Sequence, residues 1–156
     1  MPTTPQANDG PPAPASLTAR AMAFVIDAAL LLSLYLGSLL ALTSLPATTG
    51  GVADPAVLLL LGTIALLFLV AGPVALPACY FPILHASCGQ TLGKIFLGIR
   101  VSGPTGPLSI GAAFLRWCAL PLSLLPLGAG FLWALGNERR ACWHDLLADS
   151  TVIEDR

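Results

Sequence analysis

One acidic side chain stands inside an otherwise apolar stretch of this sequence. Asp27 is the single charged residue between Ala21 and Leu42, and Arg20 directly precedes that run. The run is long enough for an α-helix to cross a bilayer core of roughly 30 Å, where an ionised carboxylate costs about 2.5–3.5 kcal/mol or more. Asp27 must therefore pair, face a watery cavity or carry a proton. Two interpretations stay open: it binds a cation or proton, or it forms a structural pair that holds helices together.

Arg20 is badly placed to be the partner of Asp27. On a helix the two lie on nearly the same face but two turns apart, roughly 10 Å along the axis. An arginine near a helix end also tends to extend outward to the interface. We therefore expect Asp27 to find another cationic partner. The candidates are Lys94, Arg100, Arg116, Arg139, Arg140 and His144.

The dipeptide His144-Asp145 offers a second chemistry. Asp145 could orient the imidazole or neutralise an arginine, and His144 could relay protons near neutral pH. Because the dipeptide closely follows Arg139 and Arg140, we favour a structural cap and a salt bridge beside those arginines.

The cysteines do not predict a metal site. Four of them, Cys79, Cys88, Cys118 and Cys142, are widely spaced and form no CxxC pair. We expect small buried thiols rather than a disulfide or a zinc site. Cys142 and His144 are close in sequence, but two donors alone make a poor ligand set.

The segment GQTLGK, residues 89–94, is not a phosphate-binding loop. Its glycines are four residues apart, and Ile95 stands where the motif needs a hydroxyl. We expect the glycines to turn the backbone at the membrane surface and Lys94 to contact lipid phosphates.

The composition is that of an integral membrane protein. Of the 156 residues, 56% are hydrophobic and 10% charged, against about 25% charged residues in soluble domains. The length allows one domain, and the net charge of −1 argues against a nucleic-acid partner. The sequence offers no nucleophile–base pair, no carboxylates at catalytic spacing and no cofactor fingerprint, so we expect neither an enzyme nor a bound cofactor.

The expected fold is an all-α membrane protein with two transmembrane helices, a third apolar segment broken by Pro and Gly, and a basic cytoplasmic loop. Pro73, Pro77 and Pro82 should kink the second helix beyond Gly72. The predicted elements are a disordered Pro/Ala-rich tail (1–16), a membrane domain (17–153) with helices over about 20–42 and about 56–82, the basic loop (85–116), the third apolar segment (117–136), and a polar C-terminus (154–156).

The distribution of positive charge predicts the orientation of the chain. The loop 85–116 contains Lys and Arg but no acid, which places it in the cytoplasm together with the N-terminus. The third apolar segment is either a re-entrant hairpin or a third span. Arg139 and Arg140 favour the hairpin, because it keeps the basic clusters on one side of the membrane.

Two local features are expected near the membrane surface. Ser109 is a suitable N-cap for a helix that runs to Trp117. Ser150–Ile153 has the composition of a strand and is expected to pair with Ile99–Val101.

Taken in order, these motifs resemble the RDD family of bacterial membrane proteins. Arg20 and Asp27, in RAMAFVID, match the family's first arginine and aspartate, and Asp145, in HDLLAD, matches the further aspartate. The segment GQTLGKIFLGIRV is similar to the family's glycine-rich pattern, and Arg116 matches a frequent arginine. One departure is Asp149, where the family often has glycine. The resemblance covers about residues 17–153.

The resemblance implies an integral membrane domain without enzymatic activity, often suggested to transport unidentified ligands. We therefore expect a multi-pass protein of the bacterial inner membrane. Its first candidate function is transport of a cation, a proton or another small ligand by Asp27, with Arg20 and Asp145 in the same site. Possible modulators are Lys94, Arg116 and His144.

The alternative function is a non-transporting accessory or scaffold protein whose Arg and Asp residues are structural. Two spans and a hairpin cannot enclose a transport pathway by themselves. Besides the lipid bilayer, we therefore expect a second copy of the chain or a larger membrane partner.

Overall fold

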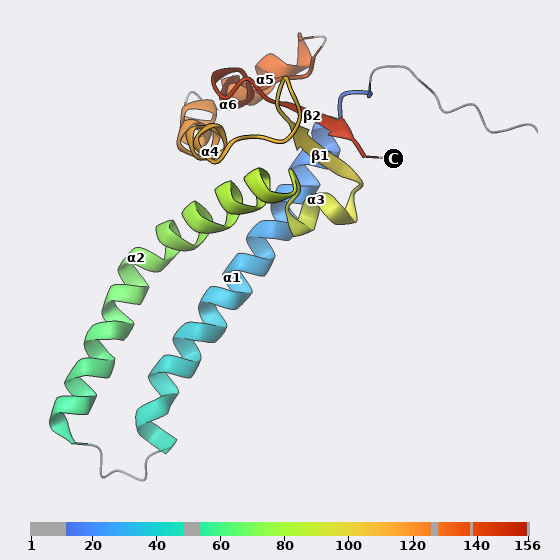
Figure 1. Ribbon diagram of the computed structural model, residues 1–156. Coiled ribbons are helices and arrows are strands. Elements are labelled where there is room, and N and C mark those ends of the chain that lie inside the picture. Colours follow the sequence, from blue (N-terminus) through green and yellow to red (C-terminus); the bar gives the residue numbers. More distant parts are fainter. Residues whose placement is uncertain (1–11, 49–53, 126–127, 138, 156) are drawn as a thin grey trace, which may run out of the picture.

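Two long antiparallel helices dominate the computed structural model, which describes residues 12–48, 54–125, 128–137 and 139–155. Helix α1 (Leu17–Thr48) and helix α2 (Pro55–Ser87) are each long and apolar enough to cross a membrane. Figure 1 shows them as a hairpin that projects from the rest of the chain. Large apolar side chains along both helices are exposed, as a lipid-facing surface requires, among them Val25, Leu40, Leu59, Leu67 and Val70.

Both helices are longer than predicted. Helix α2 starts at Pro55, directly after Asp54, whose carboxylate accepts a hydrogen bond of 2.8 Å from the Ala56 amide. Pro at the first helical position and Asp as the cap are a favourable start. The three internal prolines do not end the helix, which continues to Ser87, but its axis curves along its length (Figure 1).

Aromatic contacts and a small residue bring α1 and α2 together. The rings of Tyr35 and Phe68 stack with centroids 5.3 Å apart, and the Tyr35 hydroxyl donates to the Leu69 carbonyl at 3.0 Å. Gly72 faces Tyr35 so closely that an added Cβ would lie 2.8 Å from its ring. Nearer the polar end, Phe24 and Phe81 stack at 6.2 Å.

The predicted strand pairing is confirmed. Strands β1 (Ile99–Ser102) and β2 (Thr151–Glu154) form an antiparallel pair in which Arg100 lies opposite Ile153 and Val101 opposite Val152. Part of the tail expected to be disordered lies beside this sheet, because the Ala15 amide donates to the Val152 carbonyl at 2.9 Å. Residues 1–11 of that tail lie outside the described residues.

The third apolar segment is broken, as predicted. Helix α4 (Ile110–Leu124) is capped by Ser109, which accepts from the Ala112 amide at 3.2 Å. It extends well past Trp117, so the predicted boundary between loop and apolar segment at 116/117 lies inside one helix. Gly128, with a φ of 78°, begins α5 (Ala129–Leu132), and the 3-10 helix η1 (Trp133–Leu135) follows. The axes on the two sides of the break meet at 106°.

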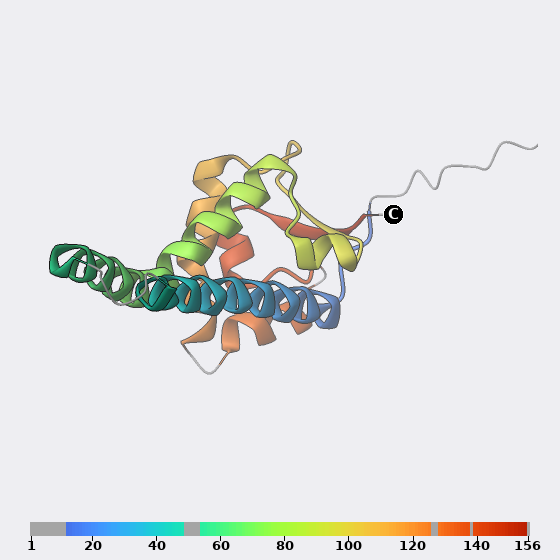
Figure 2. The same cartoon turned by 90° about the horizontal axis from the view of Figure 1, so that it is seen from below.

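These shorter elements gather at the end of the hairpin where α1 begins and α2 ends. They are the sheet, helix α3 (Leu92–Phe96), α4, α5 and helix α6 (Trp143–Leu147). Figure 2, turned by 90°, shows the far ends of α1 and α2 extending beyond this cluster of elements. A small core forms there, built from Ala15, Ala23, Ile99, Val101, Leu108, Ala113 and Val152.

Candidate functional site

Asp27 is held by three neutral hydrogen-bond donors. It is 1% exposed and faces the junction between α2 and α3. Oδ1 accepts from the Tyr80 hydroxyl and from the Gly93 amide, both at 2.8 Å, and Oδ2 accepts from the Thr91 hydroxyl at 2.5 Å. The expectation of a cationic partner is therefore wrong for the described part of the chain, where no ion pair to Asp27 forms. Hydrogen bonds from neutral groups compensate a buried carboxylate instead.

The orientation of the Tyr80 hydroxyl is fixed by a second contact. It accepts a hydrogen bond of 3.1 Å from the Leu92 amide, so its own proton is free to point at Asp27. Tyr80 thus connects the first turn of α3 with the carboxylate on α1.

The segment GQTLGK turns the chain and ties it to α1. Gly89 has a φ of 72°, and a Cβ added there would lie 2.6 Å from the Val101 carbonyl oxygen. At Gly93 an added Cβ would collide with the Ala23 carbonyl of α1, so only glycine allows this close approach. The motif that sequence analysis separated from phosphate-binding loops is therefore a structural one in this fold.

Asp145 neutralises two arginines from different helices. Its Oδ2 lies 3.0 Å from Nη1 of Arg20 on α1, and its Oδ1 forms an ion pair with Arg116 on α4. Asp145 is fully buried, and Oδ2 also accepts from the Cys142 amide at 3.1 Å, at the start of α6. Burial alone would raise the pKa of Asp145, but Arg116, His144 and Arg20 together hold it below its usual range.

The predicted cap at the His144-Asp145 dipeptide is confirmed, but its arginine partners are different. Arg139 and Arg140 are exposed, whereas the arginines on Asp145 are Arg20 and Arg116. Arg20 therefore turns inward, and it also donates to the Val152 carbonyl at 3.2 Å. The ion pairs join the start of α1, the middle of α4 and the start of α6.

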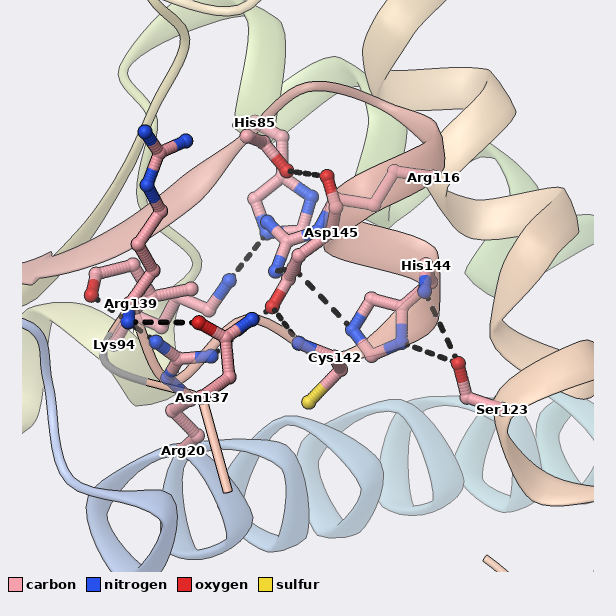
Figure 3. Close-up of polar contacts among 12 residues, drawn as sticks. Arg20, His85, Lys94, Arg116, Ser123, Asn137, Arg139, Cys142, His144 and Asp145 are labelled. Carbon is pink, nitrogen blue, oxygen red and sulfur yellow. Dashed lines mark hydrogen bonds and ion pairs between the residues drawn. The ribbon is translucent and has the colours of Figure 1, made fainter. Parts of the chain in front are cut away.

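His144 is buried and uncharged at neutral pH. Burial lowers its pKa to about 4, against the opposing influence of Asp145. Ser123 Oγ accepts from the His144 amide at 3.1 Å and lies 2.9 Å from Nδ1 of the ring, so the hydroxyl proton can donate to Nδ1. The remaining proton is then on Nε2, which lies 3.4 Å from Asp145. Figure 3 shows this arrangement.

Lys94 is buried rather than at the surface, contrary to the expectation that it contacts lipid phosphates. Its Nζ lies 2.7 Å from Nε2 of His85 near the end of α2, as Figure 3 shows. Burial, and the neighbouring Arg116, hold the pKa of Lys94 well below its usual range.

A cavity of about 500 Å³ brings these groups together. All six residues singled out in the sequence line it or contact its wall: Arg20, Asp27, Lys94, Arg116 and His144 border the cavity, and Asp145 lies behind Arg20 and Arg116. Apart from His85 and Cys142, the rest of the lining is apolar, from α1, α2, α4, the α5–η1 segment and β2. The sequence analysis missed Tyr80, Thr91, His85 and Ser123. Thr91 was the easiest of these to identify from the sequence, because it belongs to the GQTLGK motif.

The residues nearest to a metal-binding set are Cys142, His144 and Asp145, whose donor atoms lie within 4.8 Å of one another. Their environment does not suit a cation. Arg20 and Arg116 already occupy the carboxylate, and burial raises the pKa of the Cys142 thiol to about 11, so the thiolate is disfavoured. The expectation that all four cysteines are buried is wrong, since Cys79, Cys88 and Cys118 are exposed.

Asp149 departs from the family pattern at a position where the backbone favours glycine. Its φ is 44°, in the left-handed region directly after α6. Aspartate is among the non-glycine residues that tolerate this conformation, and glycine is the usual residue at such a helix end. The local turn is therefore kept despite the substitution.

The comparisons with known proteins agree with this reading. The model of the RDD family matches residues 14–149, which is most of the chain. No curated protein and no solved structure matches the sequence significantly. With its two long apolar helices and with Arg20, Asp27 and Asp145 in place, the chain belongs to the RDD family of membrane proteins.

Proposed function

We propose that this chain is a non-transporting accessory or scaffold protein of the membrane, whose Arg and Asp residues stabilise its fold. The observation that supports this most directly is that both signature acids, Asp27 and Asp145, are already bound by other side chains or amides of the fold. Three donors occupy the oxygens of Asp27, and two arginines share Asp145. A carboxylate that exchanges cations or protons needs access to water, whereas Asp27 is 1% and Asp145 0% exposed.

The contacts of Asp27 also resist the movement that transport needs. Its donors come from α2, from α3 and from the residue that precedes α3. Releasing the carboxylate would leave buried hydroxyl and amide groups unsatisfied, at about 1–3 kcal/mol for each group. Such a site stabilises one arrangement of the three segments.

The proposal includes the inner membrane of a bacterium, with the N-terminus and the basic loop in the cytoplasm. The short elements carry Lys94, Arg100 and Arg116, at the same end of the hairpin as Arg20. An excess of Lys and Arg is typical of the cytoplasmic side. The exposed apolar faces of α1 and α2 leave room for lipid, for a second copy or for a larger membrane partner.

Transport of a cation, a proton or another small ligand is the second candidate. One observation favours it, namely that Asp27 lines the same cavity as Arg20, Lys94 and Arg116. In that case the carboxylate would release its donors when the ligand enters.

Proteoliposomes distinguish the two functions. We expect no proton flux from the wild-type protein under sodium, potassium or lithium gradients. Because the partners of Asp27 are neutral, Asp27→Asn leaves no charge unpaired and should fold with a modest loss of stability, whereas Asp27→Leu should lose the folded state. Gradient-driven flux that disappears in Asp27→Asn, at matched insertion and unchanged unfolding temperature, would establish transport instead.

A further inference from the structure

The polar end of the cavity has more basic than acidic side chains. Arg20, Lys94 and Arg116 border it, and the acids near them are Asp27 and Asp145. Arg20 and Arg116 share Asp145, and within the described ranges no carboxylate forms an ion pair with Lys94. One more anion would balance these charges.

Some of the buried donors have no acceptor. Within the part of the chain that the structure describes, Nε of Arg20 and Nη1 of Arg116 have no hydrogen-bond partner. Lys94 Nζ is hydrogen-bonded to a histidine, His85, which carries no negative charge. An anion bound here would accept from these donors and would stabilise the charged form of Lys94.

The remainder of the cavity is apolar and open. Its wall includes Phe24, Leu124 and Leu135, which are 48%, 62% and 72% exposed. An occupant that fits both halves therefore has a small anionic head and an apolar chain, and a volume of about 500 Å³ lies in the usual range for a ligand pocket.

We propose that this cavity binds an anionic amphiphile, with a carboxylate or phosphate head at Lys94 and Arg116 and an acyl chain along Phe24, Leu120 and Leu124. The head supplies the acceptor that the two cations lack. The acyl chain covers apolar side chains that no element of the described chain covers. This binding does not depend on whether the protein transports anything.

Trp117 borders the cavity and provides the test. The fluorescence of Trp117 is measured in a variant that keeps this tryptophan alone (Trp133→Phe with Trp143→Phe), in a neutral detergent. The probes are dibromostearate, brominated phosphatidylglycerol, the methyl ester of dibromostearate and inorganic phosphate. We expect saturable quenching by one or both anionic amphiphiles. A variant that keeps only Trp133, which does not border the cavity, reports quenching by the micelle alone.

Lys94→Met separates the anionic head from the apolar chain. It removes the charge while keeping a chain of similar shape, and we expect the half-saturating concentration of the anionic probe to rise about tenfold or more. Arg100→Gln, which removes an exposed cation outside the cavity, should leave it unchanged. If Lys94→Met does not fold, Leu120→Trp, read through displacement of a radiolabelled probe, blocks the acyl half instead and should abolish binding.

The source of the head group follows from the probes. Preference for dibromostearate indicates a free fatty acid, and preference for brominated phosphatidylglycerol indicates a membrane lipid; both support the proposal. Three results would overturn the proposal. Equal quenching by the methyl ester would indicate a purely apolar pocket, and competition by inorganic phosphate alone would indicate a soluble anion. No quenching, together with a dimer that covers Trp117, would indicate a second copy of the chain.

Discussion

Arg20 and Asp145 lie 125 positions apart in the sequence, yet their side chains form an ion pair of 3.0 Å. The contact ties the start of α1 to the start of α6 near the C-terminal strand. Asp145 also pairs with Arg116, so one buried carboxylate serves two helices. Two of the three residues that define the family thus meet directly, while Asp27 is held two turns away by other groups.

Removing Asp145 should therefore be the most damaging single change at this site. Asp145→Asn leaves Arg20 and Arg116 buried without an anion, and we expect a loss of about 3–5 kcal/mol in the free energy of unfolding. Thermal unfolding in detergent measures it. Asp155→Asn is the control, because Asp155 pairs with Arg100 where both are partly exposed, and should change stability by less than about 1 kcal/mol. Similar losses in the two variants would contradict the structural role of Asp145.

Stability should fall between neutral and mildly acidic pH because of His144. Its pKa in the folded protein is about 4, whereas in the unfolded chain it is near 6.5. Between these values the unfolded state binds more protons, so the folded state loses stability as the pH falls. From pH 7.5 to pH 5 we expect a loss on the order of 1–2 kcal/mol from this residue.

His144→Gln tests the assignment, because it removes the titrating ring. The unfolding temperature of this variant should depend less on pH between 7.5 and 5 than that of the wild type. An identical dependence in both proteins would assign the effect to another group. Below about pH 4 both proteins should lose further stability, because the depressed pKa of Asp145 makes protonation of its carboxylate unfavourable to the fold.

Local sequence patterns predicted the elements better than their contacts. The apolar runs predicted both long helices, Ser109 predicted the start of α4, and strand-like composition predicted the pairing of β1 with β2. The helices and the strands themselves depend on residues close in sequence, whereas the pairing joins Ile99–Ser102 to the distant Thr151–Glu154. Helix ends were less accurate, since α1 and α2 both extend beyond the predicted ranges.

Local sequence patterns could not predict the partners of the buried acids. The sequence showed that Asp27 needs compensation, and a cation was the obvious candidate. Thr91 and Gly93 supply it instead, from 64 and 66 positions away, and such neutral donors leave no charge signal in the sequence. Arg20 was expected to extend outward because it lies near a helix end, but its partner Asp145 lies in a distant helix. Only the folded chain brings α6 beside α1.

Gly93 should not tolerate a side chain. The backbone of α3 lies against the Ala23 carbonyl of α1, and a Cβ at Gly93 would collide with it. We expect Gly93→Ala to lower stability by about 1–3 kcal/mol through overpacking, as measured by thermal unfolding. Gly111→Ala is the matched control, because an added Cβ meets nothing within 4 Å there. Equal unfolding temperatures for the two variants would contradict the close approach of α3 to α1.

The donors of Asp27 should act as one unit. Tyr80→Phe removes a hydroxyl that donates to Asp27 and accepts from the Leu92 amide, and Thr91→Val removes the donor to the other oxygen with little change in shape. We expect each variant to lose about 1–3 kcal/mol, because each leaves buried polar atoms unsatisfied. Since both hydroxyls serve one carboxylate, the double variant should differ from the sum of the single effects by at least about 0.5 kcal/mol.

Tyr35→Phe is the control for these variants. Its hydroxyl donates to the Leu69 carbonyl, outside the Asp27 cluster. Because residue 73 is a proline without an N–H, the Leu69 carbonyl has no helical donor, so Tyr35→Phe should itself cost about 1–3 kcal/mol. Its effect should also add to that of Thr91→Val, because the two residues share no partner. Strict additivity of Tyr80→Phe and Thr91→Val would contradict a shared carboxylate, and it would return Asp27 to the status of a group free to bind a ligand.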